Sequence, residues 1–172
     1  MKARAILIAA AVVLAFPAPA MAQRDAASVI AKFKQRNPRI GKAFASAYGY
    51  AIFPTVGKGA VGIGGAHGSG EVFERGRRIG RSSLTQVTIG FQLGGQAYSE
   101  VVFFKDRTAL EDFKRGHFEL DAQASAIALT ARAGGDLAYR HGVAIVTMGK
   151  GGLMYEAAVG GQKFSYHPLG GA

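Results

Sequence analysis

The chain has 172 residues, of which 25 are Gly and none is Cys or Trp, and 21 Lys and Arg residues outnumber 11 Asp and Glu residues. With 49% apolar and 19% charged residues it can bury the core of one domain, which excludes wholesale disorder, a collagen-like repeat and a coiled coil. The absence of Cys excludes disulfides, thiol nucleophiles, thiolate zinc sites, iron–sulfur clusters and lipoprotein acylation.

Residues 1–22 have the pattern of a secretory signal peptide. Lys2 and Arg4 precede an apolar run over residues 5–16, and small residues follow up to Ala22. The run is shorter than the roughly 20 apolar residues that a membrane-spanning helix needs. We therefore expect export from a bacterium into the periplasm, where the protein can attach peripherally to a membrane. Nucleic acid is not expected as a partner there.

Residues 23–46 are predicted to form an amphipathic helical segment. Over residues 25–36 apolar side chains recur at helical spacing, namely Ala26, Val29, Ile30 and Phe33. Asn37 can cap a second helix that has Pro38 in its first turn.

Residues 47–168 are predicted to form a β-rich body within the same single domain. Runs of apolar or β-branched residues are broken by Gly, at 50–53, 60–63, 71–73, 84–93 and 97–104. Because Gly inside a strand allows a sheet to bend, we expect a curved, mostly antiparallel sheet or partial barrel. Thr108 and Glu111 form a capping-box pattern that predicts one inserted helix, which Gly116 ends.

The last third of the chain is less uniform. Residues 118–131 fit both a helix and a strand, and the period of two favours a strand. Three apolar runs separated by Gly-rich turns then predict a three-stranded meander, at 143–148, 153–159 and 162–166. The predicted fold class is therefore α+β, with helices first and a mostly antiparallel sheet after them.

Basic residues of the helical segment are the first candidate binding site. This N-terminal basic group consists of Lys32, Lys34, Arg36, Arg39 and Lys42. Ile30 and Phe33 could give it an apolar edge. Near an anionic leaflet each Lys or Arg contributes about 1 kcal/mol, and burying an apolar side chain adds roughly 1.5–3 kcal/mol. The alternative is that Ile30 and Phe33 pack on the sheet and leave only the charges outside.

A second cluster, the hairpin basic group, consists of Arg75, Arg77, Arg78 and Arg81. Gly76 and Gly80 lie among these residues, which indicates the tip of a hairpin. Guanidinium groups fit phosphates because they donate paired hydrogen bonds. The alternative is a solvated turn without a ligand.

Catalytic and metal sites have little support in the sequence. Residues 57–62 satisfy G-x-G-x-x-G, but a Gly-rich, strand-like stretch follows them where a nucleotide-binding fold has a helix. The histidines lack the spacing of zinc ligands, at His67, His117, His141 and His167. We expect no enzyme activity, no metal site and no cofactor.

Four segments resemble the SYLF domain, a family of lipid-binding modules, in the family's order. They are AYGYAIFPTVGKGAVGIGG (47–65), SGEVFERG (69–76), VTIGFQLGGQAYSEVVFF (87–104) and GKGGLMYEAAVGGQKFSY (149–166). The resemblance implies binding to anionic or phosphoinositide-like head groups through a basic N-terminal surface, and in some eukaryotic members actin bundling. The chain departs from the family over residues 152–157, where the family tends to have a further Gly.

The sequence therefore predicts an exported, non-catalytic module that attaches reversibly to anionic membrane lipids. One alternative is a structural or protein-interaction module with a protein partner in the cell envelope. A further alternative is a small outer-membrane β-barrel, which 150 Gly-rich residues after Ala22 would permit. The predicted helices and the non-aromatic end, Gly170-Gly171-Ala172, argue against that alternative.

Overall fold

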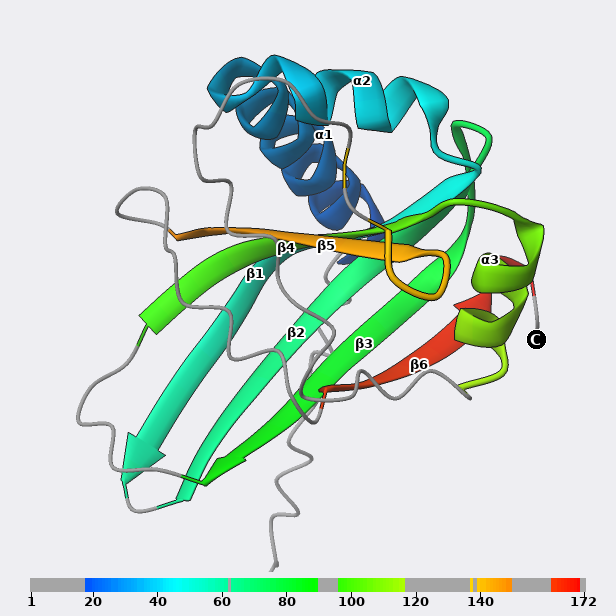
Figure 1. Cartoon of the computed structure of the whole chain (residues 1–172). Helices are drawn as coiled ribbons and strands as arrows, with labels where there is room; N and C mark the ends of the chain where they lie inside the picture. The colour runs from blue at the N-terminus through cyan, green and yellow to red at the C-terminus, as the bar shows by residue number, and fades with distance from the viewer. Residues whose placement is uncertain are drawn as a thin grey trace, which may run out of the picture.

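The computed structural model describes residues 18–61, 63–89, 96–116, 137, 139–149 and 162–170. The elements are, in chain order, α1 (Ala18–Arg36), α2 (Pro38–Ser46), β1 (Gly49–Val61), β2 (Ile63–Glu74), β3 (Arg77–Ile89), β4 (Gln96–Phe104), α3 (Arg107–Lys114), β5 (Val143–Gly149) and β6 (Gln162–Pro168). The described strands form one antiparallel sheet in the order β5-β4-β1-β2-β3-β6 (Figure 1). The predicted α+β class is confirmed.

The sheet is strongly curved, as the sequence predicted (Figure 1). Nε2 of Gln162 on β6 donates a hydrogen bond to Oε2 of Glu100 on β4, at 3.0 Å. Three strands lie between β4 and β6 in the sheet. A flat sheet would hold these two strands about 19 Å apart, at roughly 4.8 Å per step. The contact therefore crosses the inside of the curve, and we call this side the concave face.

Glycines inside β2 make room for side chains of β1. A Cβ atom on Gly70 would lie 2.5 Å from the carbonyl oxygen of Ile52 and 2.6 Å from the ring of Phe53. A Cβ atom on Gly68 would lie 2.9 Å from Cγ2 of Val56. Residues of β1 pack closely against these glycines, and β2 continues through both positions. The predicted short runs are accordingly parts of longer strands, and the run predicted at 60–63 was wrong, because it spans the end of β1 and the start of β2.

Helices pack on both faces of the sheet. On one face α1 and α2 contribute Ala26, Val29, Phe33, Ile40 and Ala43 to an apolar cluster with β1, β4 and β5. On the concave face α3 contributes Leu110 and Phe113, both fully buried, to a second cluster with β1–β6. Both clusters contain buried residues of β1, β4 and β5, because successive side chains of a strand point to opposite faces.

Helix boundaries follow the predicted signals in part. Asn37 caps α2 by accepting a hydrogen bond from the backbone N–H of Arg39 at 2.9 Å, as predicted. For α3 the predicted cap was wrong: the carboxylate of Asp106 accepts from the N–H of Ala109 at 3.0 Å, so the helix begins before Thr108. α1 begins at Ala18, within the predicted signal peptide. None of the described helices combines the length and apolar character needed to cross a membrane.

The first and last runs of the predicted closing meander are strands, β5 and β6. β5 and β6 lie at opposite edges of the sheet, where β5 pairs with β4 and β6 pairs with β3. The middle run of the meander, 153–159, lies outside the described residues, as do 118–131 and the end of the run predicted at 84–93. Turn spacing alone could not indicate that β6 returns to pair with β3, because such pairing depends on contacts far apart in sequence.

Candidate functional site

The apolar edge of the N-terminal basic group packs on the sheet. Phe33 is 1% exposed and lies in the same cluster as Val29, while Ile30 is half-buried against that cluster. Phe33 is therefore a core residue and is not available at the surface. The structure agrees with the alternative in which the apolar residues pack on the sheet and the charges remain outside.

Most cations of the N-terminal basic group are exposed. Lys32, Lys34, Arg36 and Lys42 are exposed, and Arg39 is half-buried. Nζ of Lys34 lies 5.6 Å from the ring centroid of Phe44, which places a cation of α1 over an aromatic ring of α2. The sequence of α1 and α2 contains a single acidic residue, Asp25. These two helices thus present a surface with a large excess of positive charge.

The hairpin basic group surrounds a tight turn between β2 and β3, as predicted. Arg75 has φ +49° and Gly76 has φ +78°. Two successive positive φ angles are typical of the type I′ turn, whose twist suits antiparallel strands. Arg77 begins β3 directly after the turn and is exposed.

The four arginines of this group have different environments. Nη1 of Arg78 lies 2.6 Å from Oε1 of Glu71, whose side chain is 4% exposed, so Arg78 neutralises a buried carboxylate. The Arg75 guanidinium carbon lies 5.0 Å from the ring centroid of Tyr48. Arg77 and Arg81 are exposed. The exposed cations of the hairpin are thus Arg75 and Arg77 near the turn and Arg81 further along β3.

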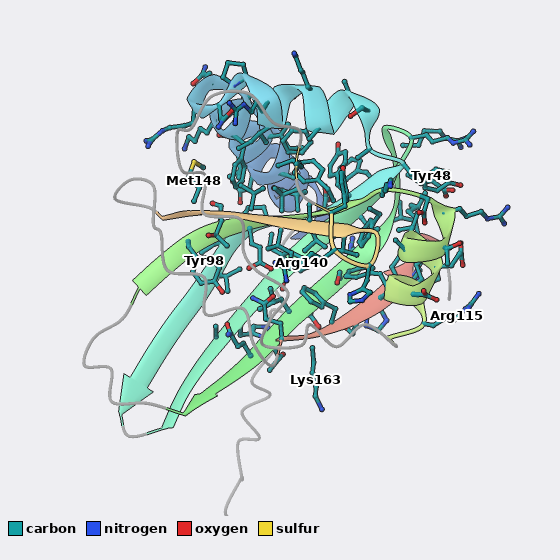
Figure 2. All side chains as sticks on the ribbon, viewed as in Figure 1. Tyr48, Tyr98, Arg115, Arg140, Met148 and Lys163 are labelled. Carbon is teal, nitrogen blue, oxygen red and sulfur yellow. The ribbon has the colours of Figure 1, made fainter. Side chains whose placement is uncertain are left out.

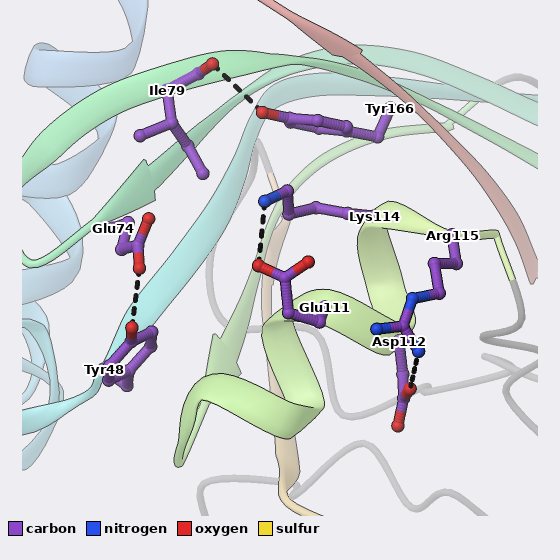
Figure 3. Close-up of polar contacts among 8 residues, drawn as sticks. All are labelled: Tyr48, Glu74, Ile79, Glu111, Asp112, Lys114, Arg115 and Tyr166. Atoms are coloured by element: carbon purple, nitrogen blue, oxygen red, sulfur yellow. Dashed lines mark hydrogen bonds and ion pairs between the residues drawn. The ribbon is translucent and has the colours of Figure 1, made fainter.

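Tyr48 joins the hairpin tip to the end of α2. Its carbonyl oxygen accepts a hydrogen bond from the N–H of Arg75 at 2.9 Å, and its hydroxyl donates to Oε1 of Glu74 at 2.6 Å (Figure 3). The hydrogen bond to Glu74 is the main cause that raises the pKa of Tyr48. Figure 2 shows Tyr48 at the end of the sheet where α2 leads into β1. The structure therefore holds the hairpin tip beside α2.

Sequence reasoning missed basic residues that the antiparallel order brings to the same end of the sheet. Lys105 and Arg107 follow β4, Arg140 precedes β5, and all three are exposed. The backbone N–H of Lys105 donates to the carbonyl oxygen of Gly142 at 2.8 Å, which holds these two loops together. With the exposed residues near the turn they form what we call the sheet-end basic group: Arg75, Arg77, Lys105, Arg107 and Arg140.

Two acidic residues at this end already have partners in the fold. Glu74 accepts the hydrogen bond of Tyr48, and Asp106 caps α3. The pairing of strand ends was the signal that could have identified this group, because β4 ends and β5 begins beside the start of β1. Within the described residues, no set of three or more His, Cys, Asp or Glu side chains is arranged to hold a metal ion.

Comparison with known proteins identifies the C-terminal half of the domain. Residues 85–167 match the model of the Ysc84 family, described as "Las17-binding protein actin regulator". "Beta cell expansion factor A" from Aeromonas veronii is 26% identical over 124 residues, which are 70% of this chain and 46% of that protein. The chain thus spans less than half the length of this curated relative. These matches confirm the resemblance to the SYLF family, and the Ysc84 (SYLF) domain match covers residues 85–167.

Proposed function

We propose that this protein is an exported, non-catalytic module that binds anionic phospholipid or phosphoinositide-like head groups reversibly. The observation that carries the proposal is that α1 and α2 direct different side chains to the sheet and to the surface. Their apolar side chains pack on the sheet, while Lys32, Lys34, Arg36 and Lys42 remain exposed. Such a surface is suited to attraction by an anionic leaflet at the level of the head groups.

The mechanism of attachment is mainly electrostatic. Each Lys or Arg close to an anionic leaflet contributes about 1 kcal/mol, so the four exposed cations of α1 and α2 supply about 4 kcal/mol. Because Phe33 is in the core, insertion of its ring does not add to this sum. The sheet-end basic group lies beside the end of α2 and extends the attractive surface.

A protein partner in the cell envelope is the second candidate. The description of the matching family, "Las17-binding protein actin regulator", refers to the binding of a protein. The same exposed cations would also suit an acidic protein surface. Vesicles made of lipid alone distinguish the two functions, because they contain no protein.

The test is co-sedimentation of the protein with vesicles of phosphatidylglycerol mixed with phosphatidylcholine, compared with vesicles of phosphatidylcholine alone. We expect retention on the anionic vesicles only. Lys32→Glu, Lys34→Glu and Arg36→Glu together should lower the bound fraction at least tenfold, because three attractive contributions of about 1 kcal/mol each become repulsive. Arg75→Glu with Arg77→Glu tests the sheet end in the same assay.

A matched control changes the net charge by the same amount elsewhere on the protein. Arg115→Glu and Lys163→Glu reverse two exposed residues outside the candidate basic groups, and they are compared with Lys32→Glu and Lys34→Glu on α1. If this control lowers binding as much as the helix variant does, net charge and not the helix surface governs attachment. Equal binding to both kinds of vesicle would refute the head-group proposal and favour the envelope protein partner.

A further inference from the structure

Three buried polar side chains meet on the concave face of the sheet. Glu100 and Gln162 are 0% exposed, and Tyr98 is 9% exposed. Besides its 3.0 Å hydrogen bond to Oε2 of Glu100, the Gln162 side chain is hydrogen-bonded to the Tyr98 side chain. Tyr98 and Glu100 belong to β4 and Gln162 belongs to β6, so this polar contact ties together two strands that do not pair in the described sheet.

The contact between Glu100 and Gln162 lacks one hydrogen-bond donor. Oε1 of Glu100 and Oε1 of Gln162 are both buried, and neither has a partner among the described residues. An ionised carboxylate and an amide oxygen are both acceptors, so they cannot satisfy each other. A protonated carboxyl group has an O–H donor. A single proton on Oε1 of Glu100 would therefore supply the missing donor.

The surroundings of Glu100 favour its neutral form. The opposite face carries exposed basic side chains of β2, β3 and β6, namely His67, Arg81, Lys163 and His167. Nζ of Lys114 on α3 is bonded to Oε1 of Glu111 at 2.9 Å and lies over the ring of Tyr166. Among the side chains that the structure describes, the titratable neighbour is Tyr98, whose pKa is raised by burial and then by the charge of Glu100.

Burial raises the pKa of Glu100 to about 7, and the hydrogen bond from Gln162 opposes this shift to a smaller extent. A buried carboxylate loses its hydration, which disfavours the charged form. The direction of the shift agrees with the missing donor.

We propose that Glu100 is a proton-binding site, and that a proton on this carboxyl group completes its pairing with Gln162 and fastens β4 to β6 across the concave face. Loss of the proton leaves both Oε1 atoms without a donor among the described residues and loosens this fastening. The inference goes beyond lipid binding and does not depend on it.

The pKa of Glu100 differs between the unfolded chain and the folded protein, and this difference makes stability depend on pH. The carboxyl group ionises at about 4.5 in the unfolded chain and at about 7 in the folded protein. Its contribution to stability is therefore fully present below pH 4.5 and is lost as the pH rises towards 7. Above pH 7 the buried charge remains as a constant cost.

Infrared spectroscopy of the folded protein tests the proton directly. The carbonyl band of a protonated carboxyl group should be present at pH 6, should disappear by pH 8.5, and should be absent at both pH values in Glu100→Gln. A wild-type protein without this band at pH 6 would overturn the proposal, since the carboxylate would then be ionised. The wild-type spectrum decides the question even if the variant does not fold.

Hydrogen exchange tests the fastening of β6. In the wild type, the protection factors of β6 amides should fall between pH 5 and 7.5 by up to about tenfold per pH unit. In Glu100→Gln, which imitates the neutral carboxyl group, they should not change with pH. Glu111→Gln is the matched control, because this carboxyl group is solvent-accessible and has its pKa lowered by Lys114. The same pH dependence in Glu100→Gln as in the wild type would refute the inference.

Discussion

At the scale of single residues, the space around a Gly shows whether the fold requires it, and the sequence does not contain this information. Gly70 and Gly57 look alike in the sequence, and both lie inside long strands. A Cβ atom on Gly70 would meet Ile52 and Phe53, whereas one on Gly57 would have no heavy atom within 4 Å. Gly content could therefore predict a curved sheet, but only the packing shows which Gly is required.

Gly70→Ala should destabilise the fold by about 1–3 kcal/mol or more, because the added methyl group overpacks the contact with β1. Gly57→Ala should change the free energy of unfolding by less than about 0.5 kcal/mol, as substitutions away from close contacts do. Urea unfolding of both variants measures the difference. Equal stabilities would show that Phe53 can move aside without cost.

Asp106→Ala should destabilise the protein by about 1 kcal/mol, because it removes the side chain that caps α3. Thr108→Ala is the matched control and should have little effect, since Thr108 is exposed inside the helix. The melting temperatures of the two variants decide which residue is the cap. The opposite ranking would restore the capping box that the sequence indicated.

At the scale of elements, local patterns predicted the type of each described helix and most strands. The helical spacing of Val29 and Phe33 and the Asn37 cap were sufficient for α1 and α2, because these signals lie within a few residues of one another. The surface against which the apolar face of each helix packs was not predictable. Whether Phe33 faces a membrane or a sheet depends on β1, β4 and β5, which lie far away in the sequence.

Phe33→Ala should therefore destabilise the fold by about 3–5 kcal/mol, as expected for a fully buried aromatic ring. Lys32→Ala, one position away and exposed, should stay within about 0.5 kcal/mol of the wild type. Thermal unfolding of the two variants provides the comparison. Deletion of residues 25–36 should lower the melting temperature strongly for the same reason, and a small effect of Phe33→Ala would return this ring to the candidate membrane surface.

At the scale of the whole molecule, the arrangement separates charge from the apolar core. The basic groups lie on α1, α2 and one end of the sheet, whereas Glu100 and Gln162 on the concave face are buried. Composition predicted the excess of positive charge, and the hairpin pattern predicted Arg75 and Arg77. Neither pattern could predict that Lys105 and Arg140 lie in the same basic group, because the strand order alone brings their loops beside the turn of β2 and β3.

The net charge of +10 makes attachment sensitive to ionic strength. Raising salt from 0.05 M to 0.5 M shortens the screening length from about 14 Å to about 4 Å, so exposed cations lose their attraction to an anionic leaflet unless they touch a phosphate. We expect most of the protein to leave phosphatidylglycerol vesicles over this range in a sedimentation assay. Because Phe33 is in the core, little apolar insertion should remain to hold the protein at high salt. Binding that persists at 0.5 M salt would instead indicate apolar insertion and contradict the electrostatic mechanism.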